Sequence, residues 1–253
     1  MFVSSPWLVR RPAPEAKLRL YCFPFAGGQA GVFAPWHGRL PGVELCAIQL
    51  PGRGARAGEP PMRSMSDIVR HVAQAIAEQG PHRFAFFGYS LGTLVAFEVA
   101  RRLAARGSTR PLHLFASACD APRDRALRTP LHLLQDVELS QALRDYGGTP
   151  LEVLQNKELM TILMPMLRAD FGLVHDYAYH PQPLLDMPLT VFGGLRDPYG
   201  DIHAIHGWTD ETTAASRIHW FDGDHFFLYS HADALLAEIA ADLSTHTAAA
   251  AIA

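Results

Sequence analysis

The chain has 253 residues, of which 49% are hydrophobic and 19% are charged. This apolar content excludes intrinsic disorder as the main state, and the length fits one α/β domain with an insertion better than two separate cores. The formal net charge of -3 lacks the basic surplus with which proteins displace counterions from nucleic acid, so DNA and RNA are excluded as partners.

The cysteines and the apolar runs indicate the compartment. Cys22, Cys46 and Cys119 are an odd number spread far apart, which predicts buried, reduced thiols rather than a disulfide framework or a zinc finger. No stretch approaches the ~20 apolar residues of a membrane span, and residues 1–14 lack the apolar run of a signal peptide. We therefore expect a cytoplasmic protein that makes no contact with a membrane.

Short runs of strand-forming residues alternate with helical patterns along the chain. Several of these runs are apolar throughout, as in parallel strands that helices cover on both faces. The predicted strands are residues 18–23, 45–50, 84–89, 112–118, 189–192 and 217–221. Together they predict an α/β fold with a mostly parallel central sheet flanked by helices.

Three helices are expected to pack against this sheet. Ser66 and Asp67 introduce the first, residues 91–103 form a mostly apolar second helix directly after the third strand, and the last helix is C-terminal. The apolar stripes that predict the first and last helices are Ile68, Val72 and Ile76, and Leu235, Leu236, Ile239 and Leu243.

Residues 123–180 break the alternation, because they contain about three helical stretches and no convincing strand. The segment is rich in leucine and in methionine, whose side chain adapts to irregular surfaces. We interpret it as a helical lid, inserted into a single domain that spans residues 1–253. A helical hairpin that merely completes the core is the alternative.

Residues 88–92, Gly-Tyr-Ser-Leu-Gly, fit the pattern G-x-S-x-G between a predicted strand and a predicted helix. The small glycines allow a turn tight enough to hold Ser90 in a strained backbone conformation, with its hydroxyl at the carboxyl edge of the sheet. In this context the motif predicts Ser90 as the nucleophile of a hydrolase.

A serine hydroxyl needs a base to take its proton and a carboxylate to orient that base. His225 lies in the loop between the last strand and the last helix and is the predicted base. Asp197, after the penultimate strand, is the favoured carboxylate, with Asp120 after the preceding strand as the alternative. The chain order Ser90, Asp197, His225 is that of α/β-hydrolases.

The oxyanion that forms during attack needs backbone donors. We expect these to be the N–H groups of Leu91, at the start of a helix, and of Ala26, in the glycine-containing loop after the first strand, with Phe25 as the alternative to Ala26. His203 and His206 have a spacing that metal ligands can have, but no third ligand is evident. We predict neither a metal nor a cofactor.

Five segments together resemble the type II (external, editing) thioesterases that accompany polyketide and nonribosomal peptide synthases. The segments are residues 23–28 (Phe-Pro-Phe-Ala-Gly-Gly), 49–53 (Gln-Leu-Pro-Gly-Arg), 88–92 together with 96–98, 167–170 (Leu-Arg-Ala-Asp) and 223–228 (Gly-Asp-His-Phe-Phe-Leu). The resemblance runs from about residue 20 to residue 237. It implies the α/β-hydrolase fold, a triad of Ser90, Asp197 and His225, and a lid at residues 123–180.

The resemblance also implies a stand-alone enzyme that removes aberrant acyl groups from the phosphopantetheine arm of acyl and peptidyl carrier proteins. One position departs from the family, which usually has histidine before the nucleophile where this chain has Tyr89. From this we expect an altered shape or polarity of the pocket rather than lost catalysis. The rival functions are a general serine esterase or lipase, a product-releasing thioesterase, and a non-enzymatic binding protein on the same fold.

Carrier proteins tend to be acidic, so arginines could form a docking face for them, although scattered arginines are more often ordinary solvated surface. The candidate docking residues are Arg53, Arg56, Arg63, Arg101, Arg102 and Arg106. We expect the enzyme to act as a monomer.

Overall fold

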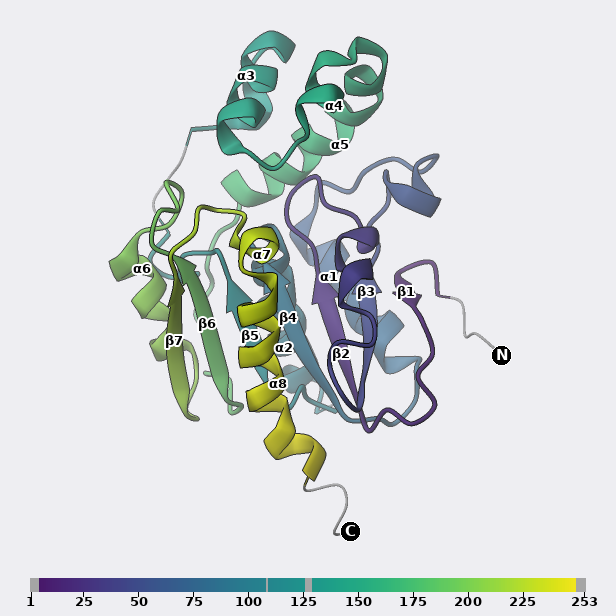
Figure 1. Cartoon of the computed structure of the whole chain (residues 1–253), viewed down its shortest axis with the longest axis vertical. Helices are drawn as coiled ribbons and strands as arrows, with labels where there is room; N and C mark the ends of the chain where they lie inside the picture. The colour runs from purple at the N-terminus through teal and green to yellow at the C-terminus, as the bar shows by residue number, and fades with distance from the viewer. Residues whose placement is uncertain (1–4, 108, 126–128, 249–253) are drawn as a thin grey trace.

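The computed structural model describes residues 5–107, 109–125 and 129–248. In this part of the chain, seven strands form one sheet in the order β1-β3-β2-β4-β5-β6-β7 (Figure 1). Every neighbouring pair is parallel except β1 and β3, which are antiparallel. The strands are β1 (Leu8–Arg10), β2 (Leu18–Phe23), β3 (Val43–Ile48), β4 (Phe84–Tyr89), β5 (Leu114–Ser117), β6 (Leu189–Gly194) and β7 (Ser216–Phe221). The predicted α/β fold is confirmed.

The predicted strand bounds hold best in the centre of the sheet. Strands β2 and β4 have the predicted bounds, whereas β3 begins and ends two residues earlier than residues 45–50. Leu50 is apolar but already belongs to the turn that continues into Pro51. Strand β1 was not predicted, because its three residues are too few for a periodic pattern, and only pairing with β3 at the sheet edge defines it.

Helices cover both faces of the sheet (Figure 1). Helices α1 (Met65–Ala77) and α2 (Leu91–Ala105) pack on one face and α8 (Ala232–Ala248) on the other. Successive strand residues enter opposite cores, so that Phe86 contributes to the first and Phe87 to the second. Both faces are buried at the centre of the sheet, which explains why the sequence of β4 is apolar throughout.

Helix α1 starts slightly earlier than predicted. Its N-cap is Ser64, whose hydroxyl accepts a hydrogen bond from the N–H of Asp67 at 3.2 Å. The predicted introduction by Ser66 and Asp67 is therefore wrong by two residues, because two serines of equal capping ability precede the apolar stripe.

Between β5 and β6, helices α3 (Asp136–Tyr146), α4 (Leu151–Gln155) and α5 (Lys157–His175) stand together beyond one end of the sheet, at the top of Figure 1. The described part of residues 123–180 contains no strand. These helices share a core of Leu139, Leu143, Met160, Met164, Met166, Leu167 and Phe171. The remaining helices are short: α6 (Ile202–His206), α7 (Phe227–Ser230) and the 3-10 turns Ala30–Trp36, Gly54–Arg56, Leu131–Leu133 and Gly207–Glu211.

Cys22, Cys46 and Cys119 are buried, as predicted, and none of the three is bonded to another described cysteine. Among the described residues, we find no helix that combines the length and the apolar character needed to cross a membrane.

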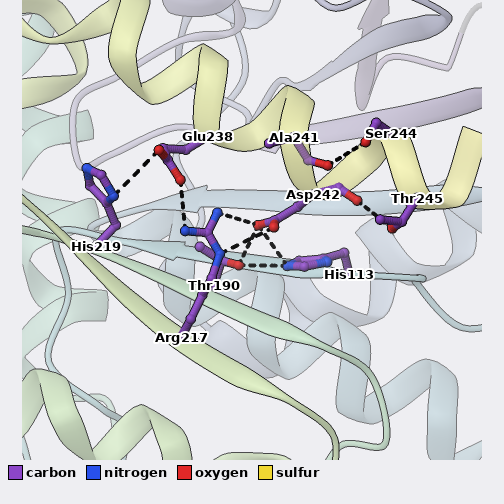
Figure 2. Close-up of polar contacts among 9 residues, drawn as sticks. All are labelled: His113, Thr190, Arg217, His219, Glu238, Ala241, Asp242, Ser244 and Thr245. Atoms are coloured by element: carbon purple, nitrogen blue, oxygen red, sulfur yellow. Dashed lines mark hydrogen bonds and ion pairs between the residues drawn. The ribbon is translucent and has the colours of Figure 1, made fainter.

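A polar cluster attaches α8 to the sheet (Figure 2). Arg217 of β7 donates to Asp242 at 2.9 Å and to Glu238 at 2.8 Å, both on α8. The Thr190 hydroxyl donates to Asp242 at 2.7 Å, so its oxygen accepts from Nε2 of His113, 2.9 Å away. Nε2 of His113 therefore carries a proton.

Burial is the largest influence on His113 and lowers its pKa from 6.5 to about 4, despite the opposing attraction of Asp242. Between these two pH values the unfolded chain binds a proton that the folded chain does not, so the free energy of unfolding falls as the pH falls. We expect this residue to remove about 2–3 kcal/mol between pH 7 and pH 4.5. Urea denaturation of the wild type and of His113→Gln at both pH values measures the effect, and equal losses in the two proteins would contradict it.

Candidate active site

The turn between β4 and α2 holds Ser90 at φ 53° and ψ -117°, a conformation that residues other than glycine rarely adopt. Glycine is required on both sides of it. A Cβ on Gly92 would lie 2.0 Å from the carbonyl oxygen of Phe23, and a Cβ on Gly88 would lie 2.4 Å from Cα of Thr93. The predicted sharp turn from strand to helix is confirmed, and it places the serine at the carboxyl end of β4.

The structure brings together the three side chains predicted to form a triad. Nδ1 of His225 lies 2.7 Å from Oδ2 of Asp197, and Nε2 lies 3.3 Å from Oγ of Ser90. Because the partner of Nδ1 is a carboxylate, we assign the ring proton to Nδ1, which leaves Nε2 as an acceptor. The other oxygen of Asp197 accepts from the N–H of Tyr199 at 2.8 Å, which fixes the carboxylate.

Asp120, the alternative carboxylate, does not occupy the position at Nδ1. It accepts a hydrogen bond from the N–H of Asp201 at 3.0 Å. Asp120 lines a cavity that Ser90 also lines. The preference for Asp197 therefore agrees with the geometry.

Tyr89 supports the loop that carries His225. Its hydroxyl donates to the carbonyl oxygen of His225 at 2.6 Å and accepts from the N–H of Leu228 at 3.3 Å. Burial raises the pKa of Tyr89 well above its usual value, so the hydroxyl keeps its proton and remains a donor. Tyr89 is fully buried and is not part of the cavity lining, so its contribution to the pocket is indirect, through the loop that carries His225.

The predicted oxyanion donors come from two adjoining segments. Leu91 is the first residue of α2, where an N–H has no partner within the helix, and it lines the cavity. In the loop after β2, Gly27 N–H donates to Asp170 and Gly28 N–H to Phe25. No hydrogen bond from the Ala26 amide to another described residue is found. Ala26 itself does not line the cavity, and the packed ring of its alternative, Phe25, does not line it either.

A buried ion pair holds this loop in place. Arg53 donates to both carboxylate oxygens of Asp170, at 2.6 and 2.8 Å, and also to the carbonyl oxygen of Gly28 at 3.2 Å. The Asp170 carboxylate accepts from Gly27 N–H at 2.7 Å. Arg53 and Asp170 are 5% and 0% exposed, so the pair is shielded from water. It joins α5 to the segment after β3, and both partners also hold the loop after β2.

This pair is not among the features predicted from the sequence, where Arg53 is only one of six arginines that could form a docking face. A signal was present, since Asp170 interrupts an apolar stretch of a helix, and a charge there is rarely buried without a partner. The proposed docking face is wrong for three of its six arginines, because Arg53, Arg56 and Arg101 are buried.

Ser90 lines a cavity of about 380 Å³. The ends of the strands and the helices beyond the sheet both contribute to its wall. The lining includes Ala118, Cys119 and Asp120 from the segment after β5, and Tyr146, Phe171 and Val174 from α3 and α5. A group bound to Ser90 would therefore lie between the sheet and the helices of residues 123–180. Among the described residues, no three His, Cys, Asp or Glu side chains are grouped as metal ligands.

Residues 18–243 match the family model described as the thioesterase domain. The chain belongs to the thioesterase family. It is 41% identical over 232 residues to the gramicidin S biosynthesis protein GrsT of Aneurinibacillus migulanus, with 90% of this chain and 91% of GrsT covered. This thioesterase is a thioester hydrolase with the α/β-hydrolase fold.

Solved structures of thioesterases, among them the type II thioesterase BorB, are similar over nearly the whole chain. BorB, from the borrelidin biosynthetic cluster, has a TM-score of 0.87 and 33% identity, covering 95% of this chain and 98% of BorB. RedJ, from the prodiginine pathway of Streptomyces coelicolor, has a TM-score of 0.85 and 38% identity, covering 92% of this chain and 97% of RedJ.

Proposed function

We propose that Ser90, His225 and Asp197 carry out the hydrolysis by which this type II thioesterase removes aberrant acyl groups from carrier proteins in polyketide or nonribosomal peptide synthesis. The observation that carries the proposal is the continuous contact from Asp197 through His225 to Ser90, at the mouth of a cavity large enough for an acyl group. The contacts among the three residues are complete within one chain, and we propose that the enzyme acts as a monomer.

In the acylation step, Oγ of Ser90 attacks the thioester carbonyl carbon while Nε2 of His225 takes the hydroxyl proton. The carbonyl oxygen becomes an oxyanion, which the N–H groups of Leu91 and Ala26 stabilise. The tetrahedral intermediate then collapses, the carbon–sulfur bond breaks, and Nε2 returns the proton to the leaving sulfur. The products of this step are the free phosphopantetheine thiol and an acyl ester on Ser90.

In the deacylation step, Nε2 takes a proton from a water molecule that attacks the acyl ester. The ester bond to Oγ breaks, Nε2 gives the proton back to Oγ, and the acyl group leaves as a carboxylic acid. Asp197 keeps its charge throughout and stabilises the imidazolium that forms in each step. No cofactor takes part.

The helices of residues 123–180 act as a lid on the single domain that spans the chain. The position of these helices supports this role. Helices α3 and α5 contribute residues to the cavity wall and stand beyond the carboxyl end of the sheet (Figure 1). The partner is an acyl or peptidyl carrier protein, whose phosphopantetheine arm reaches Ser90. GrsT, BorB and RedJ are each named for a biosynthetic pathway, which favours this class of partner.

A comparison of substrates tests the proposed function. With one short acyl group presented on a carrier protein, on free pantetheine and as an oxygen ester, we expect kcat/KM to be highest for the carrier-bound thioester. An advantage of at least about tenfold corresponds to about 1.4 kcal/mol of added binding energy, which a few carrier contacts supply. A preference for the oxygen ester would identify a general esterase. The full-length product chain on the same carrier protein is a fourth substrate, and a preference for it over the short acyl group would identify a product-releasing enzyme.

A further inference from the structure

A tyrosine of the lid and Ser90 both lie within hydrogen-bond distance of Nε2 of His225. Tyr146 is the last residue of α3, and its hydroxyl lies 3.1 Å from Nε2 of His225, slightly closer than Oγ of Ser90 at 3.3 Å. The two hydroxyls approach the same atom from different elements of the fold, one from the lid and the other from the turn after β4.

Packing holds the tyrosine in this position. Its ring stacks on Tyr199 at 4.1 Å between centroids and meets the edge of Phe171 at 5.7 Å. The chain then leaves α3 through Gly147 at φ 87° and passes so close to Phe226 that a Cβ on Gly148 would lie 2.1 Å from its ring. The surrounding side chains and backbone therefore fix the Tyr146 hydroxyl next to His225.

Only one of the two hydroxyls can donate to Nε2 at a time. With the ring proton on Nδ1 facing Asp197, Nε2 offers a single lone pair. When Tyr146 donates to it, Nε2 cannot accept the proton of Ser90, and the serine is not activated.

The reaction needs the position that the Tyr146 hydroxyl occupies. The leaving sulfur must come within hydrogen-bond reach of Nε2 to receive its proton, and the attacking water must later do the same. A hydroxyl 3.1 Å from Nε2 stands in the way of both. Tyr146 must therefore leave Nε2 when the substrate binds and stay away until the acyl group is released. Because it lines the cavity, an entering acyl thioester can displace it.

We propose that Tyr146 is a positioning residue that occupies Nε2 of His225 in the substrate-free enzyme and is displaced by the entering thioester. This inference rests on the proposed function of the triad. Part of the substrate's binding energy is used to displace the Tyr146 hydroxyl, so the tyrosine raises KM. It also slows the reaction of Ser90 in the free enzyme with a small reagent. It does not slow the chemistry of the bound substrate.

The Tyr146→Phe variant keeps the ring and removes the hydroxyl. We expect a fluorophosphonate to label Ser90 about three to ten times faster in this variant, since the net worth of one hydrogen bond is lost from the resting state. On an acyl-carrier thioester, kcat/KM should rise by the same factor through a lower KM, with kcat unchanged. Tyr146→Leu, which also lacks the hydroxyl, should show the same faster labelling if the phenylalanine variant folds poorly.

Tyr179→Phe is the matched control, because it removes a tyrosine hydroxyl that lies outside the cavity and donates to Glu211. We expect its labelling rate, KM and kcat to equal those of the wild type. Unchanged labelling in both Tyr146 variants would overturn the inference, and so would a reduced kcat at an unchanged melting temperature, because the hydroxyl would then assist the chemistry. Absence of label on Ser90 in the wild type would instead overturn the proposed function, and the inference with it.

Discussion

The Ser90→Ala variant is expected to lose turnover of carrier-bound acyl thioesters by a factor on the order of 10⁶, the loss typical of removing a serine nucleophile. His225 and Asp197 would remain in place, but no atom would be left to form the acyl ester. The fold should be retained, because Oγ of Ser90 bonds only to His225 among the described residues, and alanine fits the same backbone turn. Steady-state kinetics and a thermal melt of the same preparation measure both expectations.

Two controls make this result specific. Ser66→Ala changes an exposed serine on α1 and should leave kcat and KM as they are. A fluorophosphonate should add to the peptide that contains Ser90 in the wild type and to no residue of the Ser90→Ala variant. Activity near the wild-type level in Ser90→Ala would exclude the serine mechanism, whatever the labelling shows.

The Asp170→Ala variant is expected to be destabilised by about 3–5 kcal/mol, the usual cost of removing one partner from a buried ion pair. Arg53 would be left charged in a dry site, and Gly27 N–H would lose its acceptor. Because Gly27 follows Ala26 directly, the proposed oxyanion donor would also shift, and kcat should fall by up to about 10²-fold. Urea denaturation gives the first value, and kinetics below the melting temperature give the second.

The effect on stability can be separated from the effect on catalysis. Combining Arg53→Met with Asp170→Leu removes both charges, so most of the lost stability should return. The loop after β2 would still lack its hydrogen bonds to Arg53 and Asp170, so kcat should stay low. Asp186→Ala breaks an exposed pair with Arg110 and should unfold at nearly the wild-type urea concentration. If Asp170→Ala were as stable as Asp186→Ala, the buried pair would have no structural role.

Local patterns in the sequence predicted the parts of the enzyme that depend on neighbouring residues. The apolar runs of β2 and β4 gave the correct strand bounds, because buried parallel strands need apolar side chains on both faces. The motif at residues 88–92 predicted the turn at Ser90, since only glycine fits beside it. The edge strand β1 has no such pattern and depends on its pairing with β3.

Chain order was enough to bring the predicted triad side chains to one edge of the sheet. Asp197 and His225 each follow a parallel strand, and the carboxyl ends of parallel strands meet at the same edge, so their proximity to Ser90 follows from the topology. The contact of Tyr89 was not predicted. Although Tyr89 is next to Ser90 in the chain, its side chain points away from the cavity and its hydroxyl bonds to the loop that carries His225.

The contacts made by the helices of residues 123–180 were decided by tertiary structure alone. Tyr146 meets His225 across 79 residues, and Arg53 meets Asp170 across 117. No periodicity in a single sequence encodes such pairs, since each depends on where α3 and α5 settle above the sheet. The sequence by itself therefore determined the sheet, the serine turn and the order of the reacting groups. Only the packing of α3 and α5 against the site decided which of their side chains reaches Nε2 and which buried charge holds the loop after β2.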